Sequence, residues 1–421
     1  MTIKEKLSLI DQRRNHITEL TCKYVNNLRE VKLEYINYLK DCNTCLTDLI
    51  SRKHKNILIL GATGYLGMYL MRELLKDDEV VPIVLLHHTD NTEFLNRIGI
   101  SETDSKRIRF ISGDIRNDRL GMALSDYEFV LNVTNIIVNL AVNKASNGEY
   151  DDFIESNVKP LERIIELINY SKNKIDFYQV STIGVSEGSD NNKEYSFLCE
   201  DSSEYNRDFS NIELNRNYYE SKYKAEQYLF SCAKTNDLSI YIVRVGNIAF
   251  PLEENPNYKT QDTSFGLLLS SMLRIGIFPD DKEKVLELSF VDDAAFAMSK
   301  LITHEHQLKG IHVYHVFNNA YYSFNELADI FGEYIQIEKM NYKDMYDYLI
   351  KEYESADELK QKSIEYIVDK YLCERGMHTT KTIVVNEKTI KILETMGVHW
   401  HTLKDIDIAQ FVARIYDGTI E

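Results

Sequence analysis

Residues 55–75 read KNILILGATGYLGMYLMRELL. The first six residues contain a short, continuous apolar run, which is typical of a strand buried on both faces. Three glycines follow, and they precede the helix-forming residues 68–75. Gly61 permits a tight turn, Gly64 lets backbone approach a pyrophosphate, and Gly67 lets the helix pack closely on the sheet. Because a helix N-terminus offers free N–H groups and partial positive charge to phosphates, the segment predicts a dinucleotide-binding unit.

Further apolar runs follow at intervals that suit alternating strands and helices. Strands are expected at Val80–Leu86, Ile108–Ile111, Ile136–Ala141, Ile175–Val180, Ser239–Val245 and His312–Phe317. Helices are expected over Tyr150–Ile168 and Tyr218–Ala233 and from Val291 onward. This alternation predicts an α/β fold, a Rossmann-like, doubly wound parallel sheet with right-handed crossovers.

Changes in composition and in the expected secondary structure suggest three regions along the chain. Residues 1–54 lack glycine and proline and predict an N-terminal helical extension. Residues 55–250 form the expected dinucleotide-binding, Rossmann-like domain, with returning segments near 286–320. Residues 251–421 form the expected smaller, mostly helical substrate-binding region, in which we expect residues 322–375 to be helical.

Composition limits the possible partners and compartment. The net charge of −17 would repel a nucleic acid. Residues 1–55 carry 11 basic and 7 acidic side chains, a net of +4, and form either a docking segment for an acidic partner or a solvated helix face. No apolar run is long enough to span a membrane, and the first residues do not resemble a signal peptide. The six cysteines are few and irregularly spaced, so we expect free thiols and a cytoplasmic protein. Neither the cysteines nor the histidines have the spacing of a metal-binding motif, so we expect no metal site.

A Tyr-x-x-x-Lys pair is the candidate for proton transfer. Tyr218 and Lys222 share one face of the expected helix, and a nearby ammonium is expected to lower the pKa of the phenol. The same spacing recurs at Tyr170/Lys174 and Tyr366/Lys370, so spacing alone proves little. Position singles out the first pair, because it follows a strand that ends in residues 181–182, Ser-Thr, and precedes the next strand.

Together these motifs resemble the extended short-chain dehydrogenase/reductase superfamily. The segments that carry the resemblance are GATGYLG (61–67), VST (180–182) and YYESK (218–222). Within the superfamily the chain is most similar to thioester reductases, the reductive-release domains of nonribosomal peptide synthetases and carboxylic acid reductases. The narrower similarity rests on residues 113–121, 136–143, 155–158, 244–248 and 290–293, and it covers roughly residues 55–320.

The resemblance implies a role for each matching position. Thr182 and Tyr218 would bind the substrate carbonyl oxygen, Tyr218 would donate the proton, and Lys222 would hold the nicotinamide ribose. The implied cofactor-binding set is Gly61, Thr63, Gly64, Tyr65, Leu66, Gly67, His87, Asp114, Ile115, Leu140, Ala141, Tyr218, Lys222, Gly246 and Asn247. The implied substrate is a thioester on an acyl or peptidyl carrier protein or on coenzyme A, and the product is an aldehyde or, after a second hydride, an alcohol.

Two departures leave alternatives open. His87 stands where the family usually has an arginine for the 2′-phosphate, so the cofactor is NADPH or NADH; the histidines at 87 and 88 either donate to a phosphate or form surface loop. Pro160 stands where the family has glycine. A nucleotide-sugar epimerase or dehydratase, a hydroxysteroid-type dehydrogenase and a non-catalytic dinucleotide sensor are the alternative functions.

Overall fold

The computed structural model describes most of the chain beyond its first 49 residues. The described ranges are 50–51, 55–143, 148–188, 195–200, 206–210, 212, 215–235, 237–252, 264–282, 285–305, 309–372 and 381–416. The predicted N-terminal helical extension falls outside these ranges, apart from a two-residue strand β1 (Ile50–Ser51) that pairs with β11 (His304–Glu305).

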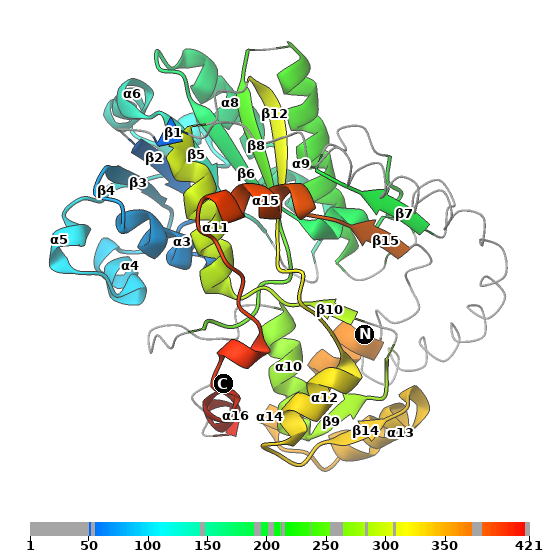
Figure 1. Cartoon of the computed structure of the whole chain (residues 1–421). Coiled ribbons are helices and arrows are strands. Elements are labelled where there is room, and N and C mark those ends of the chain that lie inside the picture. The colour runs from blue at the N-terminus through cyan, green and yellow to red at the C-terminus, as the bar shows by residue number, and fades with distance from the viewer. Residues whose placement is uncertain are drawn as a thin grey trace.

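A seven-stranded parallel sheet organises the upper part of the molecule (Figure 1). Its strand order is β12-β8-β6-β5-β2-β3-β4. The strands are β2 (Lys55–Leu60), β3 (Val80–Leu86), β4 (Arg109–Ser112), β5 (Ile136–Asn139), β6 (Asp176–Thr182), β8 (Ser239–Val245) and β12 (Gly310–Val316). The order runs outward in both directions from β2 and β5, which is the doubly wound arrangement predicted from the alternating pattern.

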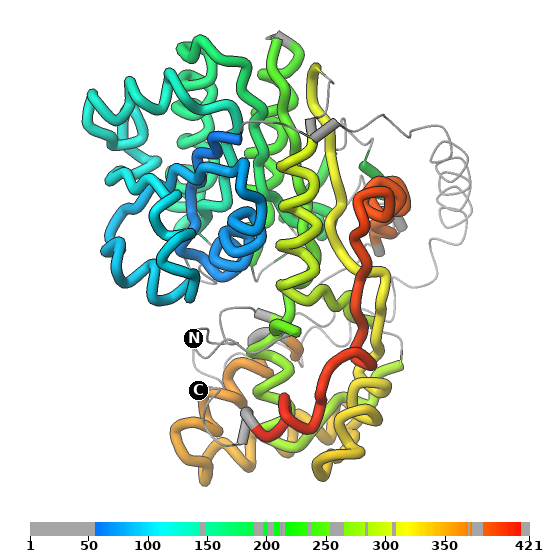
Figure 2. The backbone as a smooth tube through the Cα atoms, turned by 60° about the vertical axis from the view of Figure 1, so that its left-hand side comes forward, coloured from blue at the N-terminus to red at the C-terminus, as the bar shows by residue number. Residues whose placement is uncertain are grey.

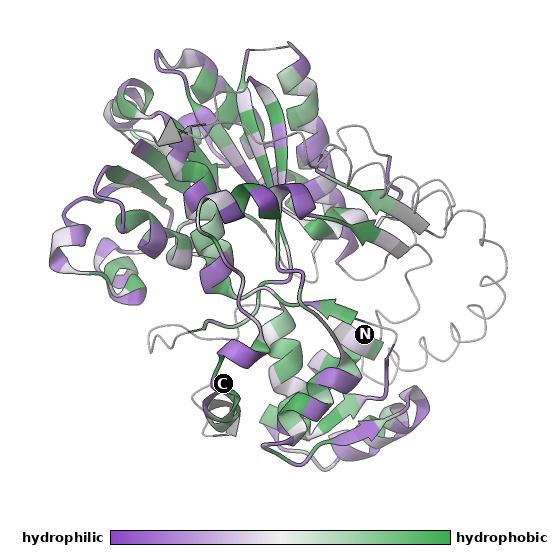
Figure 3. Cartoon of the chain, in the orientation of Figure 1, coloured by the Kyte–Doolittle hydropathy of each residue, from purple (hydrophilic) through white to green (hydrophobic). Residues whose placement is uncertain are grey.

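Helices cover both faces of this sheet, so alternate residues of each strand enter different cores. Ile57 and Ile59 of β2 pack with α3 (Tyr65–Leu75), α4 (Asn91–Ile98) and α11 (Val291–Thr303). Leu58 and Leu60 pack with the opposite layer, which contains α6 (Leu124–Val133), α8 (Pro160–Tyr170) and α9 (Arg216–Thr235). Burial on both faces explains why these strands read as continuous apolar runs, and Figure 3 shows many hydrophobic (green) residues along the strands of the sheet.

The helix predicted over Tyr150–Ile168 is wrong, because two helices occupy this stretch. They are α7 (Tyr150–Asn157) and α8, which begins at Pro160. Proline has no N–H to donate and is tolerated in the first turn of a helix, so it starts a new helix instead of continuing the old one. The break places Asn157 at the end of α7, close to the site described below.

A second hydrophobic core lies in the lower part of Figure 1. It is built from α10 (Ser264–Ile275), α12 (Phe324–Gly332), α13 (Tyr342–Tyr353), α14 (Glu358–Ile367) and α16 (Ile408–Tyr416). The expected helical stretch 322–375 also contains a short strand, β14 (Glu338–Met340), which pairs in parallel with β9 (Ile277–Pro279). A second small pair joins β10 (Val285–Glu287) to β13 (Tyr321–Ser323).

Residues 381–398 return to the large sheet before the chain enters the lower core again (Figure 2). Strand β15 (Lys381–Val384) pairs with β7 (Tyr195–Leu198), and α15 (Glu387–Thr395) packs beside β12. Ile392 and Leu393 of α15 belong to the core beneath α3 and α11. The domain boundaries placed after residues 54 and 250 stay predictions.

Candidate active site

A cleft of about 730 Å³ opens at the carboxyl ends of the parallel strands. Open α/β sheets bind ligands at this edge, beside the point where strand order reverses. Every residue predicted to contact the cofactor lines the cleft, and so does Thr182. The lining also includes Arg116, Asn143, Ser156, Tyr219 and Phe265, which the sequence did not single out.

The glycine turn between β2 and α3 forms one wall of the cleft. Gly61 has a φ of +84°, and a Cβ there would lie 2.7 Å from the Cα of Ala141 on the neighbouring strand's loop. A Cβ on Gly67 would lie 2.5 Å from the carbonyl oxygen of Gly61. Gly64 is exposed, and a Cβ there would meet only the Gly61 oxygen, at 3.4 Å. The turn is therefore a backbone cradle in front of the N-terminus of α3, and it fits a pyrophosphate.

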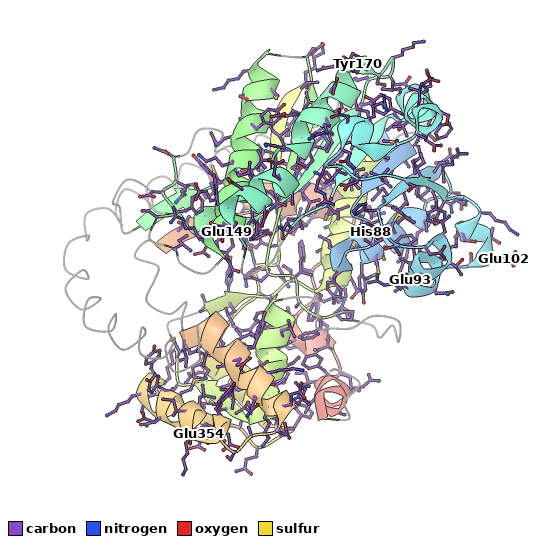
Figure 4. All side chains as sticks on the ribbon, turned by 180° about the vertical axis from the view of Figure 1, so that it is seen from behind. His88, Glu93, Glu102, Glu149, Tyr170 and Glu354 are labelled. Carbon is purple, nitrogen blue, oxygen red and sulfur yellow. The ribbon has the colours of Figure 1, made fainter. Side chains whose placement is uncertain are left out.

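One end of the cleft carries an acidic group between two basic ones. Asp114, which follows β4, lies 3.1 Å from Nε2 of His87, measured from its Oδ2. The guanidinium of Arg116 donates to the same carboxylate through Nη2 at 2.8 Å and Nε at 3.1 Å. These hydrogen bonds hold the pKa of Asp114 below its usual value. The ring of His87 lies against that of His88, with centroids 3.5 Å apart and planes tilted by 40°, and both histidines are exposed (His88 is labelled in Figure 4).

The three residues predicted to be catalytic meet at the other end of the cleft. Thr182 ends β6, and its hydroxyl forms a hydrogen bond with the phenol of Tyr218 on α9. One turn along α9, Nζ of Lys222 donates to the carbonyl oxygen of Val180 at 2.8 Å. The hydroxyl and the phenol are hydrogen-bonded to each other, and the amine of Lys222, one helical turn along α9, lines the same cleft.

The predicted lowering of the Tyr218 pKa is wrong. Burial raises the pKa of its phenol to about 12, and the hydrogen bond from Thr182 offsets only part of this rise. Burial also lowers the pKa of Lys222 to about 8, against the attraction of Glu226. Desolvation disfavours both charged forms, so it outweighs the effect that the i, i+4 spacing suggested. At neutral pH Tyr218 is a protonated phenol, which suits a proton donor.

Asn157 connects the cleft to α9, and the sequence gave it no role. Its Oδ1 accepts from the backbone N–H of Asn143 at 2.7 Å, and its Nδ2 donates to the Asn143 carbonyl at 3.0 Å. The same Nδ2 lies 2.9 Å from Oγ of Ser221, which in turn donates to the carbonyl of Tyr218 at 2.8 Å. Asn157 is 4% exposed. Two signals in the sequence point to this position: the helix break before Pro160 and the place of Asn157 within residues 155–158, which resemble the family.

A buried carboxyl supports the loop that carries Gly246 and Asn247. Oε2 of Glu287 accepts from the N–H of Asn247 at 2.5 Å, and Ser289 donates to the other oxygen. Burial raises the pKa of Glu287 to about 7 in spite of these hydrogen bonds. A Cβ on Gly246 would lie 2.5 Å from Cβ of Phe317, so the loop fits closely between its neighbours.

A model of an NAD-binding family, described as male sterility protein, matches residues 59–298. The chain belongs to this family. The match runs from the first strand of the sheet to α11, so it includes the glycine turn, Thr182, Tyr218 and Lys222. Membership supports a nicotinamide dinucleotide as the group for which the cleft is shaped.

The proteins to which this chain is similar in sequence include large synthases. The chain is 26% identical over 214 residues to the probable polyketide synthase 3 of Dictyostelium discoideum, a match that covers 46% of the chain and 7% of that protein. It is 25% identical over 126 residues to the equisetin synthetase of Fusarium heterosporum, covering 30% of the chain and 3% of the relative. The chain thus spans less than a tenth of either relative.

Solved structures share the fold over most of the chain. The terminal R domain from the myxalamid PKS-NRPS biosynthetic pathway superposes with a TM-score of 0.72, at 19% identity, over 88% of this chain and 93% of that one. A thiolation-reductase di-domain from an archaeal non-ribosomal peptide synthetase gives a TM-score of 0.67, at 20% identity, over 88% and 78%. Among the described residues, no helix is both long and apolar enough to cross a membrane.

Proposed function

We propose that this protein is an NAD(P)H-dependent reductase that releases an acyl or peptidyl thioester as an aldehyde. The observation that carries the proposal is the meeting of Thr182, Tyr218 and Lys222 in a cleft that also contains the glycine turn. The likeness to terminal reductase domains supports the thioester as the substrate class. We further propose that a phosphopantetheine carrier protein, or coenzyme A, presents the thioester.

The cofactor would supply a hydride to the thioester carbonyl carbon, and the residues of this chain would do the rest. The glycine turn would bind the pyrophosphate, and Lys222 would hold the nicotinamide ribose. Thr182 and Tyr218 would donate hydrogen bonds to the carbonyl oxygen as negative charge develops there. Since burial keeps the phenol protonated at neutral pH, Tyr218 can then transfer its proton to that oxygen.

The bonds balance without any further reactant. The carbonyl carbon gains a hydrogen and its oxygen gains the Tyr218 proton, which gives a hemithioacetal. The hydroxyl then loses its proton as the carbonyl bond re-forms and the carbon–sulfur bond breaks, and the departing sulfur takes up that proton as a thiol. A proton from solvent restores the phenol of Tyr218. The net reaction converts one thioester, one reduced nicotinamide and one proton into an aldehyde, a thiol and an oxidised nicotinamide. A second hydride transfer would give the alcohol.

A thioester panel tests this function. Purified protein is incubated with coenzyme A and carrier-protein thioesters and with NADPH or NADH, and the products are identified by mass spectrometry. We expect an aldehyde and a free thiol from at least one substrate. Cofactor binding without turnover across the panel would contradict the proposal, and tightly retained NAD would then favour an epimerase.

Two tyrosine variants give the panel a matched control. Tyr218→Phe removes the proposed proton donor, so we expect turnover to fall by about 10²–10⁴-fold. Tyr170→Phe alters the same kind of Tyr-x-x-x-Lys pair at the exposed end of α8 (Tyr170 is labelled in Figure 4) and should keep wild-type turnover.

A further inference from the structure

A row of buried polar side chains crosses the sheet beneath α9. Ser181 of β6 is paired with Arg244 of β8, and Arg244 is paired with His315 of β12. Arg244 and His315 are 0% exposed, and so is Glu226 of α9, whose carboxylate contacts Ser181 and Arg244. The proposed mechanism uses none of these four side chains.

The carboxylate of Glu226 is the centre of this row. Its Oε1 accepts from Oγ of Ser181 at 2.5 Å, and its Oε2 accepts from Nη2 of Arg244 at 2.7 Å. Nε of Arg244 also donates to it, at 3.1 Å. The carboxylate is thus held from two strands at once, by one neutral and one charged donor.

His315 fixes the far side of Arg244. Its Nε2 lies 3.0 Å from Nη1 of Arg244, and its Nδ1 lies 2.5 Å from the carbonyl oxygen of Val385. Burial and the neighbouring guanidinium hold the pKa of His315 well below its usual value, so the ring is neutral. A neutral ring accepts from Arg244 at Nε2 and donates to Val385 from Nδ1. The row therefore contains one fixed cation and one fixed anion.

The row touches the proposed catalytic residues at two points. Ser181 is the residue before Thr182, and Lys222 lies one helical turn before Glu226 on α9. Glu226 attracts the ammonium of Lys222, whose Nζ is bonded to the carbonyl of Val180 on the same strand. Besides Arg244, the described groups around Glu226 include Tyr223: burial raises the pKa of its phenol, Glu226 adds to that rise, and Arg207 opposes it.

A buried ion pair is a poor means of stabilising a fold, because desolvation offsets much of its attraction. Apolar side chains of similar size would fill the space beneath α9 at least as well. A requirement for charge at this place explains the pair better than a requirement for stability. Glu226 attracts the ammonium of Lys222, which lines the cleft.

We propose that Glu226 is a positioning residue of the reductase site, which fixes the end of β6 through Ser181 and keeps Lys222 charged, while Arg244 and His315 hold its carboxylate in place. This role rests on the proposed function, since it acts through residues assigned to cofactor binding. It explains how an amine that is almost entirely buried remains an ammonium that can donate to ribose hydroxyls.

The pH dependence of cofactor binding tests the electrostatic part. NADPH is titrated by fluorescence between pH 6 and 10 into wild-type protein, Glu226→Gln and Glu200→Gln. For wild type we expect affinity to fall above about pH 8, where Lys222 loses its proton. In Glu226→Gln this midpoint should move down by about one pH unit or more, because the opposite charge has gone.

Glu200→Gln is the matched control. Glu200 is also a buried glutamate, 2% exposed, and its Oε1 accepts from the side chain and backbone of Thr389. Its loss should lower the melting temperature and leave the pH midpoint unchanged. An unshifted midpoint in folded Glu226→Gln, or an equal shift in Glu200→Gln, overturns the proposal.

Ser181→Ala tests the geometric part and decides the question if Glu226→Gln fails to fold. It keeps the Glu226–Arg244 pair and removes only the hydroxyl that joins β6 to it. We expect several-fold weaker NADPH binding at every pH, with the wild-type midpoint retained; wild-type affinity overturns the proposal. These readouts do not require turnover, so the proposal can succeed where the thioester panel fails. Wild-type protein that binds neither NADPH nor NADH overturns both.

Discussion

Three glycine-to-alanine substitutions, two at the cleft and one at the start of β12, should separate backbone strain, atomic overlap and ligand contact. Gly310 has a φ of +96° and nothing within 4 Å of an added Cβ. Gly61 has a φ of +84° and backbone atoms of residues 140 and 141 within 2.7 Å of such a Cβ. Gly64 has neither problem, but it is exposed at the cleft wall.

The expected losses of unfolding free energy follow from these differences. Gly310→Ala should cost about 1–2 kcal/mol, the strain of an L-residue in the left-handed region. Gly61→Ala carries the same strain and also forces the turn away from the loop after β5, an overpacking that adds about 1–3 kcal/mol. Gly64→Ala should cost less than about 0.5 kcal/mol, as an ordinary surface substitution does.

Urea unfolding and NADPH titration of all three variants give the answer. We expect Gly61→Ala to lose both stability and binding, Gly310→Ala to lose stability alone, and Gly64→Ala to lose binding alone. Equal stability of Gly61→Ala and Gly310→Ala would refute the close approach of the turn to residue 141. Unchanged NADPH affinity in Gly64→Ala would refute the assignment of the turn to the pyrophosphate.

Three further predictions concern Asn157, Glu287 and the N-terminal segment. Asn157→Ala removes both hydrogen bonds between Asn157 and the Asn143 backbone, so unfolding free energy should fall by about 1–3 kcal/mol and cofactor affinity should fall with it. Unchanged values of both would contradict a supporting role for these hydrogen bonds. The pKa of Glu287 is raised on folding from 4.5 to about 7, so its ionisation costs stability as pH rises through that range. The unfolding free energy of Glu287→Gln, measured relative to wild type by denaturant unfolding, should therefore rise by up to about 3 kcal/mol between pH 4 and pH 8. A difference between the two proteins that does not change with pH would refute this. Deleting residues 1–50 should raise KM for a carrier-bound thioester more than for the thioester of a short thiol, and an equal rise would exclude a docking role for this segment.

Sequence predicted most accurately what depends on local pattern. Val80–Leu86 and Ser239–Val245 were placed to the residue, because strands covered on both faces carry unbroken apolar runs. The glycine turn was equally clear, since its spacing reflects the close approach of backbone to backbone. The Thr182, Tyr218 and Lys222 cluster followed from their order relative to two strands.

Buried polar residues that join distant segments were missed. Asn157 binds the backbone fourteen residues away, and Glu287 binds the backbone forty residues away. No periodicity marks such side chains, because their partners are set by the folded topology. The pKa of Tyr218 was misjudged for a related reason: spacing shows which groups are near, whereas desolvation depends on the whole surrounding packing.

The path of the last forty residues matters for synthesis as well as for shape. Ile392 and Leu393 complete the core beneath α11, and Phe411 completes the core of the lower helices. Neither hydrophobic core can be complete before the ribosome has synthesised these C-terminal residues. Until then, the nascent chain exposes the apolar surfaces that Ile392, Leu393 and Phe411 cover in the folded protein. A fragment that stops near residue 375 would lack these side chains and would leave part of each core exposed to solvent.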